Sequence, residues 1–292
     1  MDFVGKRRIW FIISTLLIVL GVGTMIVNGT SRGRIMNFGV DFTGGTLLTL
    51  RFQRPVTVHE VREVLAKYDL EQSVIQKTGK NDISIRCEPL DNEVRVKIIE
   101  DLKGSLGGGE LLEADVIGPV IGRELRTQAI WALIVASIGI IVYVSFRFEF
   151  NYAVAAVIAL YHDAIITTGI ISLLWREVNT PFVAAILTIM GYSINDTIVI
   201  FDRIRENIKR LGAAKKNFAE IVNISISQTL TRSINTVLTT MFMVICLLLF
   251  GGSTIKDFAL VLLIGFLCGT YSSIFVASPL LTLFKRRQKK LS

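Results

Sequence analysis

The residues best placed to do chemistry are carboxylates inside long apolar segments. Asp196 lies in the apolar run 181–203, seven residues before its charged end at Arg203, in the charged sequence that begins at Asp202. At about 1.5 Å per helical residue, it would lie roughly 10 Å below a membrane boundary. A bare carboxylate at that depth costs at least about 2.5 kcal/mol, so we interpret Asp196 as a functional residue that needs a partner. The alternative is that the helix begins later and Asp196 is only interfacial.

Polar side chains at helical spacing form stripes on the fourth and fifth apolar segments. The stripe on the fifth comprises Arg232, Asn235, Thr236, Thr239, Thr240 and Met243. The stripe on the fourth comprises Thr188, Tyr192, Asn195, Asp196, Val199 and Arg203. We expect the stripes to face each other or a wet cavity, so Arg232 is the predicted partner of Asp196, stabilising the charged carboxylate when close. The alternative is that Arg232 snorkels to the membrane interface.

The third apolar segment carries the pair His162 and Asp163, about twelve residues from its start and roughly 18 Å deep. Ala155, Ala159, Asp163 and Thr167 share one helical face, where small residues allow close helix packing. His162 is either a proton relay or a hydrogen-bonded structural histidine. A zinc site needs more ligands than this pair, and neither an HExxH motif nor a nucleophile elbow occurs. We therefore expect a protein that is not an enzyme and that binds neither a metal ion nor a cofactor.

Composition and charge place these residues in a multi-span membrane protein. Of 292 residues 51% are hydrophobic, and the mean hydropathy is +0.56. The predicted spans are residues 9–27, 128–146, 151–175, 181–203, 232–250 and 255–284. Lysine and arginine cluster before the first span, after the fourth and at the end of the chain, which predicts that both termini are cytoplasmic. The net charge of +8 therefore indicates anionic membrane lipid as a partner and not nucleic acid.

About a hundred residues separate the first two predicted spans, which is enough for a folded domain on the outer side. Strands are predicted at 46–52, 72–77, 83–87 and 111–116, and helices at 58–68 and 93–106. The order βαββαβ is that of a ferredoxin-like α+β fold. The predicted divisions are 1–27 (cytoplasmic N-terminus and first span), 28–127 (outer domain), 128–284 (remaining spans) and 285–292 (basic cytoplasmic tail).

Two segments rich in glycine and proline connect the outer domain to the spans. The first contains Gly39, Asp41, Gly44 and Gly45, and the second contains Gly118 and Pro119. A phosphate-binding loop would precede a helix, whereas the first segment leads into a strand. A hinge between domain and membrane is one interpretation, and ordinary turn chemistry is the other.

The segment 204–230 joins the fourth and fifth predicted spans and is basic and amphipathic. We expect it to form a helix lying on the membrane surface. In the sixth span, Gly265 and Gly269 form a GxxxG pattern that Ser273 continues, which favours close helix packing.

Several of these motifs together resemble the SecF family of protein-export membrane subunits. They are 38–45 (FGVDFTGG), the Gly118–Pro119 junction, His162–Asp163, and 191–197 (GYSINDT) followed by 201–207 (FDRIREN). The similarity covers nearly the whole chain. It implies six transmembrane helices, an outer ferredoxin-like domain, and membership in the resistance-nodulation-division superfamily of proton-driven transporters.

The resemblance also implies partners and a mechanism. A SecD subunit would supply six further helices, because this chain begins with its own basic segment and first span, and the pair would act beside the SecYEG channel in the prokaryotic cytoplasmic membrane. The proton motive force would drive export of unfolded preproteins, and the proton site would comprise Asp196, Arg232 and a SecD carboxylate. Two alternatives are a half-transporter for a small molecule or lipid, and a membrane scaffold without proton use.

Overall fold

The computed structural model describes residues 2–211 and 216–291 and divides into two compact units. The larger comprises Met1–Asn37, Ala132–Glu177 and Pro181–Ser292, and the smaller comprises Phe38–Trp131 with Val178–Thr180. Residues 212–215 of the predicted surface helix and residue 292 of the predicted basic tail lie outside the described residues.

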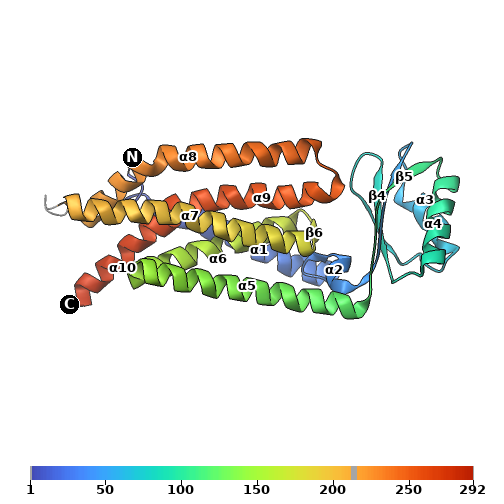
Figure 1. The fold of residues 1–292 in the computed structure, drawn as a ribbon, viewed down its shortest axis with the longest axis horizontal. Coiled ribbons are helices and arrows are strands. Elements are labelled where there is room, and N and C mark those ends of the chain that lie inside the picture. Colours follow the sequence, from blue (N-terminus) through green and yellow to red (C-terminus); the bar gives the residue numbers. More distant parts are fainter. Residues whose placement is uncertain (1, 212–215, 292) are drawn as a thin grey trace. The chain divides into compact units, whose positions relative to one another are not determined.

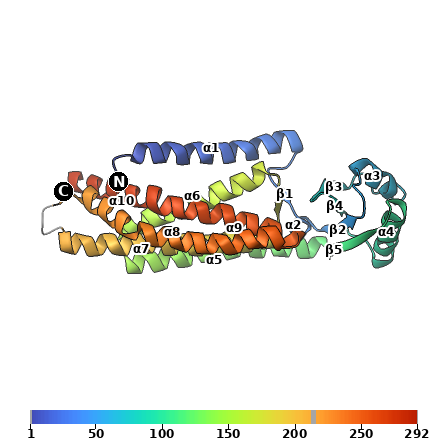
Figure 2. The same cartoon turned by 90° about the horizontal axis from the view of Figure 1, so that it is seen from above.

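The predicted spans appear as long apolar helices. They are α1 (Arg7–Arg32), α5 (Pro119–Arg147), α6 (Phe150–Leu173), α7 (Thr180–Leu211), α8 (Phe218–Phe250), and a sixth that joins α9 (Ser253–Ser272), the π-helix η2 (Ser273–Ala277) and α10 (Ser278–Leu291). Within the described residues these six are long and apolar enough to cross a membrane. Figures 1 and 2 place both ends of the chain at the same end of the larger unit, as an even number of spans requires.

The segment after the fourth span does not form a separate surface helix, so that prediction is wrong. Instead α7 continues without interruption to Leu211, and α8 already begins at Phe218. The amphipathic faces of these extensions pack on protein: Ile204 is fully buried, and the Asn207 side chain donates to Ser225 Oγ at 2.9 Å. Residues expected to lie on lipid therefore prolong two spans.

The helix α1 packs against α6, along one side of the bundle in Figure 2. Their closest approach is made by Gly21 and Gly169, where a Cβ added to Gly169 would lie 2.5 Å from Gly21 Cα. A side chain there would push the two backbones apart. Farther along, the Asn28 side chain donates to Ser172 O at 3.1 Å. The first span is thus fixed to the third by backbone contact and hydrogen bonds.

The smaller unit contains a four-stranded antiparallel sheet with the strand order β3-β4-β2-β5. Its elements are β2 (Gly45–Phe52), α3 (Val58–Ala66), β3 (Val74–Lys77), β4 (Asp82–Cys87), α4 (Asn92–Ser105) and β5 (Gly109–Ile117). This is the predicted succession of strands and helices. Figure 1 shows α3 and α4 covering one face of the sheet. Leu48, Leu50 and Ile85 on the strands pack with Leu65 and Ile98 on the helices, all of them fully buried.

We expect the segment 45–117 to fold alone, because every buried residue of this apolar cluster lies within it. Expressed without the spans, it should be soluble and show mixed helix and strand by circular dichroism. Leu50→Ala should lower its free energy of unfolding by about 2–5 kcal/mol, since it empties a packed site. The control Val74→Ala, at a half-exposed position, should change little. A disordered wild-type spectrum would contradict the expectation.

The start of α3 makes the stability of this segment depend on pH. Glu60 accepts hydrogen bonds from the Thr57 N–H and hydroxyl at 2.7 and 2.8 Å, and Arg54 lies 2.9 Å away. The Thr57 contacts first, and Arg54 next, lower the pKa of Glu60 to about 2 from 4.5. A depressed carboxyl pKa gives stability that is present above the unfolded pKa and lost as pH falls through the folded one.

Acid denaturation of the segment 45–117 should therefore separate the wild type from Glu60→Gln. The advantage of the wild type should be full above about pH 4.5 and disappear as the pH falls toward 2. Glu88→Gln, at an exposed glutamate, should retain the acid sensitivity of the wild type. An identical pH profile for wild type and Glu60→Gln would refute the assignment.

Candidate functional site

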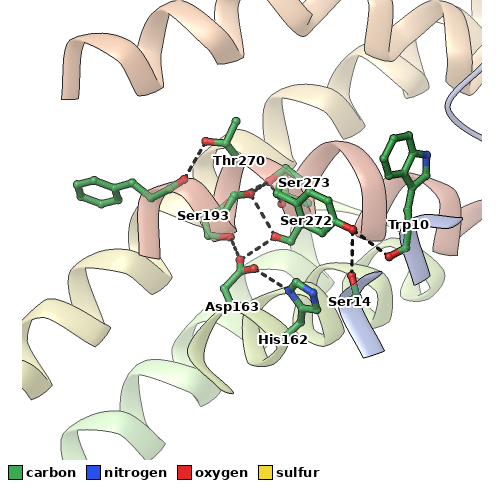
Figure 3. Close-up of polar contacts among 12 residues, drawn as sticks. Trp10, Ser14, His162, Asp163, Ser193, Thr270, Ser272 and Ser273 are labelled. Carbon is green, nitrogen blue, oxygen red and sulfur yellow. Dashed lines mark hydrogen bonds and ion pairs between the residues drawn. The ribbon is translucent and has the colours of Figure 1, made fainter. Parts of the chain in front are cut away.

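The carboxylate of Asp163 lies at the centre of a buried polar cluster in the larger unit (Figure 3). Its side chain is fully buried, and three groups bind its two oxygens. The hydroxyls of Ser193 on α7 and Ser272 on α9 donate to Oδ2 at 2.6 and 2.7 Å. Nδ1 of His162 lies 2.9 Å from Oδ1. A buried carboxylate is stable only when it is hydrogen-bonded, so Asp163 depends on these contacts. They join α6, α7 and α9 at one point.

The hydroxyl network continues from this cluster along the sixth span. Ser273 opens the π-helix, and its hydroxyl lies 2.8 Å from Thr197 Oγ1 and 2.9 Å from Gly269 O, to which it donates. One turn of π-helix inside an α-helix is uncommon and often marks a functional position. Gly269 of the predicted GxxxG pattern also packs closely on Ser193. Small residues thus bring α7 and the sixth span within hydrogen-bonding distance.

His162 has one partnered and one unpartnered ring nitrogen. Its ring stacks on that of Tyr271 with centroids 6.1 Å apart, and Nε2 is buried without a hydrogen-bond partner among the described residues. The Tyr271 hydroxyl in turn accepts from Ser14 and donates to Trp10 O on α1. Both interpretations of His162, relay and structural, are compatible with this geometry. The described residues contain no group of three or more His, Cys, Asp or Glu that could hold a metal ion.

Asp196 is held more loosely than Asp163. It is half-buried, and Ser233 on α8 donates to its Oδ1 at 2.6 Å. Its other oxygen, Oδ2, is buried with no hydrogen-bond partner among the described residues. A carboxylate oxygen that accepts nothing from the protein is open to a proton. Of the two aspartates, only Asp196 therefore has an oxygen without any hydrogen-bond partner among the described residues.

The predicted ion pair between Asp196 and Arg232 is not observed, and the contact is made by the next residue. The Arg232 side chain is exposed, and no ion pair joins it to a carboxylate within the described part of the chain. The reason is helical geometry, because successive residues differ by about 100° around the axis. Ser233 faces α7 and is buried, so Arg232 is turned outward. Asn195, beside Asp196, is likewise exposed.

Both predicted polar stripes leave an exposed edge on the bundle. On α7 the exposed members are Thr188 and Asn195, and Gly191 between them is also exposed. On α8 they are Arg232, Asn235, Thr236 and Thr239. Polar groups inside a span are costly in lipid and normally face other helices or water. The exposed edge therefore identifies a surface that needs a partner.

The residues of the two predicted junctions lie together in the smaller unit. Gly44 and Gly45 have φ of 73° and 129°, and a Cβ on Gly44 would lie 3.0 Å from Pro119 Cα. Nearby, Asp41 Oδ2 accepts from the Thr180 N–H at 2.8 Å, and the Gly39 N–H donates to Val178 O at 2.9 Å. Gly118 directly precedes α5. Whether this cluster acts as a hinge remains a prediction.

Comparison with known protein families shows which family the chain belongs to. A family model described as protein export membrane protein SecD/SecF, C-terminal, matches residues 98–287, and one described as the SecD/SecF GG motif matches residues 36–56. The chain belongs to the SecD/SecF family. The second match includes Gly44 and Gly45, so the close approach at the junction falls within a motif of the family.

Individual relatives extend over nearly the whole chain. The protein translocase subunit SecF of Sebaldella termitidis is 43% identical over 99% of this chain and 93% of its own, and that of Calditerrivibrio nitroreducens is 40% identical over 99% and 96%. The crystal structure of SecDF from Thermus thermophilus, described as a translocon-associated membrane protein, is 39% identical with a TM-score of 0.89. This chain is covered to 98%, but it spans only 39% of that chain. With six apolar helices, it is a multi-pass membrane protein of this family.

The sequence did not reveal which hydroxyls bind the two aspartates. Serine is common in apolar segments, and neither Ser233 nor Ser272 lies within one helical turn of a carboxylate in the sequence. Ser193 lies three residues before Asp196 but binds Asp163 instead. Such pairings depend on which helices are neighbours, and one sequence does not contain that information.

The cluster at Asp163 should stabilise the helix bundle. Ser272→Ala removes one donor to a buried carboxylate, which should lower the free energy of unfolding by about 1.5–3 kcal/mol. Thr236→Ala is the control, because that exposed hydroxyl bonds only its own helix, at Arg232 O. Thermal unfolding of the full chain in detergent measures both. Equal midpoints for wild type and Ser272→Ala would rule out this role.

Proposed function

We propose that this chain is a SecF-type subunit that, together with a SecD subunit, uses the proton motive force to promote preprotein export through the SecYEG channel. The relatives named protein translocase subunit SecF support a role in export. By its position in the family the chain is a coupling subunit and not an enzyme. It would reside in the prokaryotic cytoplasmic membrane with both termini in the cytoplasm, in line with its basic ends.

The observation that supports proton coupling most directly is the incomplete hydrogen bonding of Asp196. Its Oδ2 has no hydrogen-bond partner among the residues that the structure describes, whereas both oxygens of the more deeply buried Asp163 are bound. A carboxylate that exchanges protons needs an oxygen that can carry the proton in its neutral state. It needs a nearby positive charge that stabilises it in its ionised state. Asp196 has the first within this chain, and Arg232 on the neighbouring helix is the nearest source of the second. We propose that they approach during the working cycle.

Two observations support a second subunit, namely the exposed polar edge and the length of the solved SecDF chain. The SecDF structure contains a chain of which this one spans 39%, so we propose that SecD provides the rest. Its helices would cover Asn195 and Arg232, and a SecD carboxylate would compensate the exposed guanidinium. An arginine facing lipid at mid-depth would cost at least about 2.5 kcal/mol. That cost favours a protein neighbour over lipid.

The smaller unit would form the extracytoplasmic part. We propose that it is a ferredoxin-like domain, because its antiparallel order β3-β4-β2-β5 with two helices on one face is the arrangement of that fold. Its junction glycines lie in the GG motif of the family. They would transmit movement of the spans to the domain that receives the emerging preprotein.

The deciding variant is Asp196→Asn, which keeps size and hydrogen bonding but cannot ionise. In vesicles containing this chain, SecD and SecYEG, it should abolish the stimulation of export by a proton gradient. One charge moving through 100 mV is worth about 2.3 kcal/mol, or roughly fiftyfold in an equilibrium, so the loss should be large. Glu220→Gln, which removes an exposed carboxylate of α8, should retain the stimulation.

Copurification with SecD is the companion measurement, since Asp196→Asn should leave assembly intact. Undiminished stimulation in correctly assembled Asp196→Asn vesicles would show that Asp196 is structural. It would also favour the scaffold alternative.

A further inference from the structure

A pocket of about 450 Å³ lies in the larger unit where α5 ends and α6 begins, with α7 and α10 completing its walls. Its charged lining comprises Arg147, Glu149, Arg205, Lys209 and Lys285. Four of these are cations and one is a carboxylate, so the pocket has a clear positive excess. The pocket lies outside the proposed proton site.

Two of the four cations are already paired. Arg147 lies 3.1 Å from Asp202 Oδ2, and Lys285 lies 3.9 Å from Glu149 Oε2. Arg205 and Lys209, one helical turn apart on α7, form no ion pair with any residue in the described ranges. Two uncompensated positive charges therefore line the same pocket. Like charges this close repel each other, and a bound anion would relieve that repulsion.

The beginning of α6 adds to the positive potential. Glu149 is the N-cap residue of this helix, and its side chain makes no capping hydrogen bond. Glu149 itself is 70% exposed and turned toward Lys285. The amino end of a helix carries a partial positive charge and favours anions such as phosphate. The α7 cations and the α6 amino end thus point to the same class of ligand.

The surroundings of the pocket indicate where the anion comes from. Phe146 and Phe150, which flank it at the ends of α5 and α6, are 90% and 76% exposed. Exposed apolar rings at the end of a membrane span are stable in contact with lipid acyl chains and not with water. A phosphate carried by a lipid would reach the basic pocket while its acyl chains lie along these rings. A free phosphate ion would gain nothing from them.

We propose that this pocket binds the phosphate headgroup of an anionic phospholipid from the adjacent leaflet, with Arg205 and Lys209 as its principal ligands. The bound lipid would connect α7 to α5, α6 and α10 at the end of the bundle that carries both termini. Because a ligand of the folded state stabilises it, the same lipid should raise the unfolding temperature of the chain.

Native mass spectrometry of the full chain, purified in detergent with an equimolar mixture of phosphatidylglycerol and phosphatidylcholine, tests the proposal. The wild type should retain phosphatidylglycerol preferentially. Each basic residue in contact with the bound headgroup contributes about fivefold to anionic-lipid binding, so Arg205→Gln with Lys209→Gln should weaken retention about 25-fold. The matched pair Arg8→Gln with Lys216→Gln removes the same charge from exposed positions outside the pocket and should retain the lipid.

Two further measurements keep the result decisive if the double glutamine variant does not fold. Phosphatidylglycerol should raise the unfolding temperature of the wild type more than phosphatidylcholine does, and the charge-preserving pair Arg205→Lys with Lys209→Arg should keep the preference. A wild type without lipid preference, or equal losses in both glutamine pairs, would overturn the proposal. Complete displacement by excess inorganic phosphate would identify a site for a free anion, and displacement by added SecD would identify a protein interface. Either result would also overturn it.

Discussion

A carboxylate removed from water must find its hydrogen-bond donors within the protein, and this requirement organises the membrane bundle. Asp163 is fully buried, and its donors come from its neighbour His162 and from two other helices. Losing the His162 contact, or both serine hydroxyls, would leave a polar oxygen buried without a partner, which costs about 1–3 kcal/mol. The helices α6, α7 and α9 are therefore held in one arrangement. Gly269, packed on Ser193, allows the close approach that these hydroxyl contacts need.

One turn of α7 connects this fixed cluster to the more loosely held aspartate. Ser193 binds Asp163 on α6, Thr197 contacts Ser273 on the sixth span, and Asp196 between them accepts from Ser233 on α8. The bonds toward α6 and the sixth span are buried, whereas the α8 contact is half-exposed. A change of charge on Asp196 therefore acts first on the contact between α7 and α8.

Sequence patterns predicted most of the helices and strands, but they did not predict the contacts between them. Periodicity located the six apolar helices and the order of strands and helices in the smaller unit, because each depends on local spacing. It failed at residues 204–230, where an amphipathic face packs on protein and not on lipid. It also assigned Asp196 to Arg232, although Ser233 makes the contact. A long charged side chain is a conspicuous candidate, but the orientation of α8 decides which residue faces α7.

The polar groups inside the spans fall into two sets, and the division indicates how complete the site is. Both oxygens of Asp163 are hydrogen-bonded within the chain, although Nε2 of the neighbouring His162 has no partner among the described residues. Arg232 and Asn195 are exposed, and Asp196 Oδ2 has no hydrogen-bond partner in the described part of the chain. Because desolvated polar groups are stable only when paired, we expect the second set to form one half of the proposed site, with the other half on another surface. The solved SecDF chain, of which this sequence spans 39%, is long enough to contain that surface. Any charge movement through Asp196 would then be controlled by two surfaces together, and neither alone would conduct protons.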